Sequence, residues 1–178
     1  MIVNFGSINV DHVYQVPHMP AAGETLAATA YDRHLGGKGI NQSIAIVRAG
    51  GAVCHVGQVG PDGDWALEQI QSFGVDTGRI VQVAAPTGHA VIMVDARGEN
   101  QIVIASGANL ELTSNQIAEG LDAQSGADNW VLIQNEMTRS HEIAEAARKR
   151  GYRVALAAAP FVAEDVLPLI GMVDLLTV

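Results

Sequence analysis

The chain has 178 residues, of which 48% are hydrophobic, 16% charged and 4% aromatic. A chain of this length can bury one sizeable core, and its composition matches neither an intrinsically disordered chain nor a membrane protein. The formal net charge is −9, from 19 acidic and 10 basic residues. That charge would repel a phosphate backbone, so we expect no nucleic-acid partner.

The cellular compartment is indicated by three features. Residues 1–6 have no basic region before an apolar stretch, so we expect a first strand there rather than a signal peptide. No apolar run approaches the ~18 residues needed to span a bilayer. Cys54 is the single cysteine, which excludes a disulfide within the chain and fits a reducing cytoplasm. We therefore expect a cytoplasmic protein with no membrane partner.

The first 50 residues predict a buried strand, two short strands and a helix. The buried strand is at 2–5, and strand-like runs at 13–16 and 26–31 flank a loop rich in Pro and Gly. The helix begins near Lys38, carries apolar residues at helical spacing, and ends at Gly50.

The next stretch predicts a strand at 52–59, a helix at about 64–73, and a hairpin of strands at 90–94 and 101–105. These last two strands and the runs at 13–16 and 26–31 break the alternation of strands and helices. They form either a small accessory sheet or edge strands of the main sheet, and the sequence leaves the two arrangements about equal.

The last third predicts a helix from Thr113, where Thr-x-x-Gln makes a capping box, and strands at 130–133, 153–157 and 173–178. A helix at about 141–150 ends in Arg-Lys-Arg, which suits the helix dipole better than an anion site. Short apolar strands alternating with helices indicate an α/β fold with a mainly parallel sheet. Since the strand at 173–178 has no covering helix, we expect the chain to stop within a domain.

Polar residues gather where ligands bind in open α/β sheets, just beyond the carboxyl ends of the strands. Asn9 and Asp11 follow the first strand, residues 36–41 open a helix with Gly-Gly-Lys-Gly-Ile-Asn, and Glu136 follows the strand at 130–133. Carboxylates accept hydrogen bonds from vicinal hydroxyls, while Asn and Lys donate to the same oxygens. This combination predicts a site for a polyhydroxylated ligand.

Each of these features is weak alone. Gly-Gly-Lys-Gly lacks the spacing of a nucleotide P-loop, and it occurs as a simple entry turn of a helix. Asn9-x-Asp11 also fits an Asx turn without a ligand, and Glu136 also fits a solvated side chain or a charge at a helix N-terminus. No three residues have the spacing of a zinc site.

A spaced pattern resembles the N-terminal signature of the PfkB carbohydrate kinase family, and within it the ribokinases. It comprises Gly-Gly-Lys-Gly-Ile-Asn-Gln-Ser at 36–43, Gly50 and Gly-Pro-Asp at 60–62. Ribokinase-like details are Gly-Ser-Ile-Asn-Val-Asp at 6–11, Pro-x-x-Gly-Glu-Thr at 20–25, Gly-Glu-Asn at 98–100 and Gly-Ala-Asn at 107–109. The resemblance runs from residue 2 to the end of the chain.

The resemblance implies a ribokinase-like three-layer α/β/α fold with a β-sheet lid at about 13–31 and 90–105. It implies sugar contacts by Asn9, Asp11, Gly37, Lys38, Gly39, Asn41 and Glu136. It also implies ATP, Mg²⁺ and a monovalent cation such as K⁺, with their sites and the catalytic Asp beyond residue 178, and a homodimer formed through the lid. No catalytic residue is then expected within this chain.

One departure concerns residues 156–160, which read Leu-Ala-Ala-Ala-Pro where ribokinases usually read Leu-Asn-Pro-Ala-Pro. The resemblance thus implies the sugar-binding half of an ATP-dependent kinase that phosphorylates the primary hydroxyl of a pentose, with ribose favoured over other pentoses. The alternatives are a non-catalytic sugar-binding or dimerisation module from a truncated gene, and a kinase of another sugar or of a nucleoside. The 178-residue chain alone is expected to be inactive.

Overall fold

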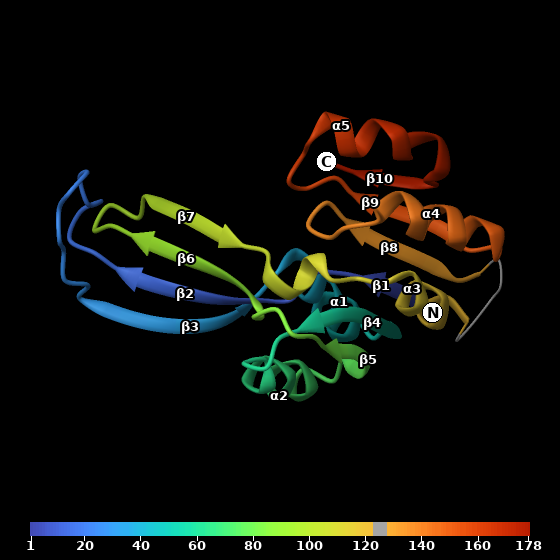
Figure 1. The fold of residues 1–178 in the computed structure, drawn as a ribbon, viewed down its shortest axis with the longest axis horizontal. Coiled ribbons are helices and arrows are strands. Elements are labelled where there is room, and N and C mark those ends of the chain that lie inside the picture. The colour runs from blue at the N-terminus through green and yellow to red at the C-terminus, as the bar shows by residue number, and fades with distance from the viewer. Residues whose placement is uncertain (123–127) are drawn as a thin grey trace.

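A computed structural model describes residues 1–122 and 128–178. Its larger sheet has six strands in the order β10-β9-β8-β1-β4-β5, and every neighbouring pair is parallel (Figure 1). In chain order these strands are β1 (Ile2–Phe5), β4 (Val53–Val59), β5 (Asp76–Gln82), β8 (Trp130–Gln134), β9 (Arg153–Ala157) and β10 (Leu175–Thr177). Parallel strands joined by helices confirm the predicted α/β class.

Helices pack on both faces of this sheet. Helices α1 (Lys38–Arg48) and α2 (Asp64–Ser72) contribute Ile40, Ile44 and Ile70 to one core. Helices α3 (Ser114–Asp122) and α4 (Ser140–Lys149) pack on the other core, which also contains strand residues of β1, β8 and β9. The shorter helices are η1 (Gly107–Leu110), α5 (Ala163–Val166) and η2 (Leu167–Met172). The result is the expected three-layer α/β/α arrangement.

A second sheet of four strands projects from this body (Figure 1). We call it the small sheet, and its strand order is β3 (Ala30–Gly36), β2 (Asn9–Gln15), β6 (Gly88–Val94) and β7 (Asn100–Ala105). Strands β2 and β6 are parallel, and the two outer pairs are antiparallel. The segments that break the strand–helix alternation therefore form an accessory sheet rather than edge strands of the main one.

Two strand predictions were wrong in position. The strand predicted at 26–31 is β3, at Ala30–Gly36, and the run predicted at 13–16 is β2, which begins at Asn9. Strand β3 lies at the edge of the small sheet and is largely exposed, so it needs no apolar pattern to mark it. Strand β5 was not predicted, because it opens with the turn-like residues Asp76, Thr77 and Gly78.

The helix ends follow the sequence signals. At α3 the Thr113 hydroxyl accepts a hydrogen bond from Gln116 N–H at 3.3 Å, and Gln116 Oε1 accepts one from Thr113 N–H at 2.8 Å. This confirms the capping box. The basic residues closing α4 pair with carboxylates, for example Arg148 with Asp174 at 2.8 Å. Within the described residues, no helix has the length and apolar character needed to cross a membrane.

Candidate functional site

The site begins where the end of β1 meets the start of α1. Gly37 has a φ of 97°, a conformation that L side chains rarely adopt. A Cβ on Gly39 would overlap the backbone of Gly6, so the helix can approach the strand this closely only with glycine there. The close approach brings the N–H groups at the start of α1 toward Ser7 and the end of β8.

Glu136 follows β8 and is bound by both Ser7 and Lys38. Its Oε2 accepts hydrogen bonds from Ser7 Oγ at 2.6 Å and from Lys38 N–H at 3.0 Å. Its Oε1 lies 2.7 Å from Lys38 Nζ. Burial raises the pKa of Glu136, but the hydrogen bonds from Lys38 and Ser7 outweigh this effect and leave the pKa below its ordinary value. Glu136 is therefore an anion fixed between two strands and a helix.

Asp11 is a second carboxylate, half-buried on β2 against Gly36, where a Cβ would collide with the Asp11 carboxylate. Burial raises the pKa of Asp11, and the negative charge of Glu136 raises it further, while His34 and Lys38 lower it; the net shift is upward. The Asp11 carboxylate therefore lies beside Gly36, in the segment that leads into α1.

Asn9 is held by Asn109, which lies 100 residues further along the chain. Asn109 Nδ2 donates to Asn9 Oδ1 at 2.8 Å, and Asn109 Oδ1 accepts from Ile8 N–H at 2.9 Å. A Cβ on Gly88 would collide with both amides, so glycine is needed on the adjacent strand. The Nδ2 group of Asn9 donates to no described residue, and it remains available to a ligand.

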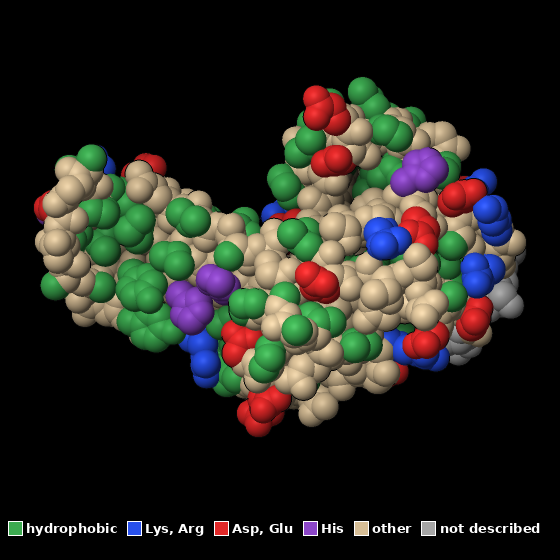
Figure 2. Space-filling view, in the orientation of Figure 1, with side chains coloured by type: hydrophobic (Ala, Val, Ile, Leu, Met, Phe, Trp, Pro, Cys, Tyr) green, Lys and Arg blue, Asp and Glu red, His purple; other side chains and the backbone are tan. Residues whose placement is uncertain are grey.

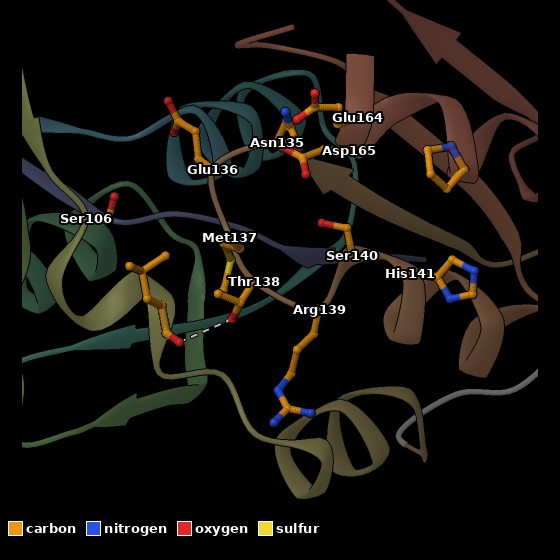
Figure 3. A pocket seen from close by; sticks show the side chains of 12 residues that line it. Ser106, Asn135, Glu136, Met137, Thr138, Arg139, Ser140, His141, Glu164 and Asp165 are labelled. Carbon is orange, nitrogen blue, oxygen red and sulfur yellow. Dashed lines mark hydrogen bonds between the residues drawn. The ribbon is translucent and has the colours of Figure 1, made fainter. Parts of the chain in front are cut away.

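A pocket of about 220 Å³ joins these groups. It is lined by Ser7, Asn9, Ile104, Ser106, Asn109, Asn135, Glu136 and Pro160. A larger pocket of about 670 Å³ adjoins it and shares Ser106, Asn135 and Glu136 (Figure 3). In Figure 3 the segment from Asn135 to His141 runs along this larger pocket, with Glu164 and Asp165 on the α5 side.

The structure places two of the predicted sugar contacts, Asn9 and Glu136, in the lining of the smaller pocket. Lys38 binds Glu136 and Asp11 packs against Gly36, but neither of these two side chains lines either pocket. Gly37 and Gly39 allow the close approach of α1. Asn41 lies exposed in the first turn of α1, and it lines neither pocket. Sequence reasoning missed Ser7 and Asn109 as members of this site.

A largely buried polar network connects α1 with three strands of the main sheet. Gln134 Nε2 donates to Asn4 Oδ1 at 2.7 Å and to Gln42 Oε1 at 2.6 Å, while Asn4 Nδ2 donates to the Gly39 carbonyl at 2.8 Å. His55 Nδ1 lies 2.9 Å from Ser43 Oγ. Burial lowers the pKa of His55 to about 4, so its ring is neutral at pH 7. The network fixes α1 against β1, β4 and β8.

The resemblance assigns no nucleotide- or metal-binding residue to residues 1–178. In the described part of the chain, no three His, Cys, Asp or Glu side chains are grouped to hold a metal ion. Ala157 and Ala158, which stand where ribokinases usually have Asn-Pro, are buried and offer no polar side chain.

Comparison with known proteins shows similarity to one family of kinases along the chain. The pfkB family of carbohydrate kinases matches residues 1–178. The ribokinase of Haemophilus influenzae is 37% identical over 175 residues, which cover 94% of this chain and 57% of that protein.

Two solved structures are similar in fold. The ribokinase of Cryptococcus neoformans in complex with ADP gives a TM-score of 0.82 at 33% identity, covering 98% of this chain and 55% of that one. The Arabidopsis thaliana ribokinase complexed with ribose and ATP gives 0.77 at 30% identity, covering 89% and 53%. The chain thus spans about half the length of these relatives, and over that span it belongs to the pfkB family of carbohydrate kinases.

Proposed function

We propose that this chain supplies the sugar-binding part of an ATP-dependent kinase that phosphorylates the primary hydroxyl of a pentose, with ribose as the favoured substrate. The observation that carries the proposal is the pocket of about 220 Å³ in which Asn9 and Glu136 meet. Sites for drug-sized ligands have volumes of ~300–1,000 Å³. The smaller volume of this pocket suits a smaller ligand, such as a monosaccharide.

The proposed chemistry within this chain is orientation. Asp11 and Glu136 accept hydrogen bonds from hydroxyls of the sugar, and Asn9 Nδ2 and Lys38 Nζ donate to its oxygens. Holding the reactive hydroxyl in line with a phosphoryl donor lowers the entropic part of the barrier. ATP and Mg²⁺ enter the proposal from the family resemblance, and ATP also from the nucleotides bound to the related ribokinases. We assign no catalytic base, metal ligand or K⁺ ligand to residues 1–178.

A non-catalytic sugar-binding module is a second candidate, because the chain spans only about half of its relatives. Calorimetry with D-ribose, D-fructose and adenosine, followed by an ATP-dependent phosphorylation assay, separates the candidates. Because residues 1–178 alone are expected to bind ribose without turnover under either candidate, the phosphorylation assay uses the protein as its source organism makes it: turnover of ribose favours the kinase, and binding without turnover favours the module. A preference for adenosine or fructose would replace ribose as the substrate, and no binding of any of the three would refute the sugar site.

We also propose that two copies pair through the small sheet, and that the protein resides in the cytoplasm. Ile102 and Ile104 are 50% and 54% exposed, and their cross-strand partners are Ile92 and Ala90. Together they form an apolar stripe on the same face of the small sheet as Asp11. Light scattering over a range of concentrations tests the pairing: Ile102→Lys should give monomers where the unmodified chain gives dimers.

A further inference from the structure

A pocket of about 250 Å³ lies behind the small sheet, where this sheet meets the body. It is lined by Val10, His12, Arg33, Asp62, Trp65, Pro86, Thr87 and His89. Side chains alternate between the faces of a strand, so Val10 and His12 lie on the face opposite Asn9 and Asp11. Arg33 is the cross-strand partner of His12, and His89 that of Val10, which places all four on this face. The pocket is therefore separate from the candidate sugar site.

Arg33 provides the positive charge of this pocket. Its guanidinium lies 4.0 Å from the centre of the Trp65 ring, and it makes no hydrogen bond or ion pair within the described residues. Most other basic side chains pair with a carboxylate, as Arg148 does with Asp174. Stacking on an indole fixes the plane of the guanidinium and leaves its N–H donors free for a ligand.

The two histidines add further polar atoms. His89 Nδ1 lies 3.3 Å from the Thr87 carbonyl, which can only accept, so the proton of the neutral ring is on Nδ1 and its Nε2 is an acceptor. His12 Nδ1 lies 2.8 Å from the hydroxyl of Tyr31, and the two imidazoles meet edge to face at 6.1 Å. Neither Nε2 has a partner among the described residues. Figure 2 shows two histidines side by side at the base of the small sheet, next to a basic side chain.

Asp62 is the one carboxylate that lines this pocket. Its Oδ1 accepts hydrogen bonds from Thr87 N–H and Thr87 Oγ1, both at 2.8 Å, which leaves Oδ2 free of any described partner. A fully deprotonated anion would be repelled by this oxygen. An oxyanion that carries an O–H group can donate that hydrogen to Asp62 or to Nε2 of His89, and present its charged oxygens to the N–H groups of Arg33.

We propose that this pocket is a second ligand site, which binds a small oxyanion bearing at least one O–H group. Inorganic phosphate, which keeps an O–H group at neutral pH, is the simplest such ligand, whereas sulfate has the same shape and no O–H group. The lining comes from strands β2, β3 and β6 of the small sheet and from Asp62 and Trp65 of the body, so a bound anion would contact both parts.

Proton NMR of the imidazole Cε1–H signals tests this site directly, since the chain has six histidines. At pH 7 and constant ionic strength, phosphate should shift the signals of His12 and His89 with one common saturation curve, and leave His18 and His141 unchanged. Sulfate should bind at least five-fold more weakly, and Asp62→Asn should abolish that preference.

Arg33→Gln should weaken phosphate binding at least five-fold. The matched control is Arg48→Gln, because Arg48 also stacks on an aromatic ring, that of Phe73 at 5.1 Å, but does not line this pocket. The site is refuted if the His12 and His89 signals do not saturate, if sulfate equals phosphate in the unmodified chain, or if Arg33→Gln behaves like Arg48→Gln.

Discussion

Lys38 binds Glu136 through both its side chain and its backbone. Its Nζ lies 2.7 Å from Oε1, and its N–H donates to Oε2 at 3.0 Å. The start of α1 and the segment after β8, 98 residues apart in sequence, are thereby fixed to each other. A sugar hydroxyl that approaches Glu136 would therefore meet a carboxylate already held in place, which reduces the entropy lost on binding.

Replacement of Asp11 by alanine is expected to weaken ribose binding at least ten-fold, because charge-assisted hydrogen bonds to sugar hydroxyls are lost. Calorimetry measures the change. Asp32→Ala is the matched control, since Asp32 is an exposed carboxylate of the same sheet, paired with Val13, whereas Asp11 is half-buried. Equal ribose affinities of the two variants would remove Asp11 from the site.

Replacement of Asp11 by asparagine is expected to increase stability at neutral pH. Burial raises the pKa of Asp11 above its ordinary value of 3.8, so the folded state holds this proton where the unfolded state has lost it. The contribution of the protonated Asp11 to the free energy of unfolding is therefore complete at low pH, and it is lost as the pH rises from 3.8 through the raised pKa. Melting temperatures from pH 3 to 7 should show an advantage of Asp11→Asn that is absent at pH 3 and present at pH 7. The opposite trend would contradict the raised pKa.

The Glu136→Gln variant is expected to lose ten-fold or more in ribose affinity and about 1 kcal/mol in unfolding free energy, because the ion pair with a partly exposed Lys38 is broken. Denaturant unfolding and calorimetry give the two quantities. Glu145→Gln is the control, since it breaks the exposed pair with Lys149. A Glu136→Gln variant that binds ribose as well as Glu145→Gln does would exclude Glu136 from the site.

His55 predicts a loss of stability in mild acid. Its folded pKa of about 4 lies below the ordinary 6.5, so the unfolded state takes up a proton first as the pH falls. The contribution of neutral His55 to the free energy of unfolding is complete above pH 6.5, and about 3 kcal/mol of it is lost as the pH drops through 4. Unfolding free energies from pH 7 to 4 should decrease less in His55→Gln than in the control His18→Gln. Parallel pH profiles of the two variants would show that His55 titrates normally.

The Gln134→Leu variant tests the buried network. It leaves Asn4 Oδ1 and Gln42 Oε1 without their donor, at an expected loss of about 2 kcal/mol in unfolding free energy. Gln101→Leu, at an exposed position of β7, should change the unfolding free energy by less than about 0.5 kcal/mol. If both variants were equally stable, the network would not hold α1 in place.

The sequence was sufficient for elements whose pattern reflects burial. Strands β1, β4, β8 and β9 are short apolar runs, and α1 ends at the predicted glycine, because burial between helical layers requires such patterns. The edge strand β3 and the turn-like start of β5 are exposed, so burial does not require an apolar pattern in them. Their positions depend on pairing with strands that are distant in sequence, and local composition does not reveal this pairing.

The candidate site was predictable only in part. Asn9, Lys38 and Glu136 follow strands or open a helix, so the topology of a parallel sheet predicts their convergence. Asn109 lies 100 residues from Asn9 in a short 3₁₀ helix, and no local pattern connects them. For Gln134 a signal existed: a polar residue that ends an apolar, buried strand must find a partner inside the protein.

Amide chemical-shift mapping with D-ribose measures most directly whether one pocket receives the sugar. Shifts are expected at Ser7, Asn9, Lys38, Asn109 and Glu136, with a common saturation curve, while the amides around Trp65 on the opposite face of the small sheet remain unchanged. No saturable shifts, or shifts centred on residues outside the pocket of Asn9 and Glu136, would contradict the proposed sugar site.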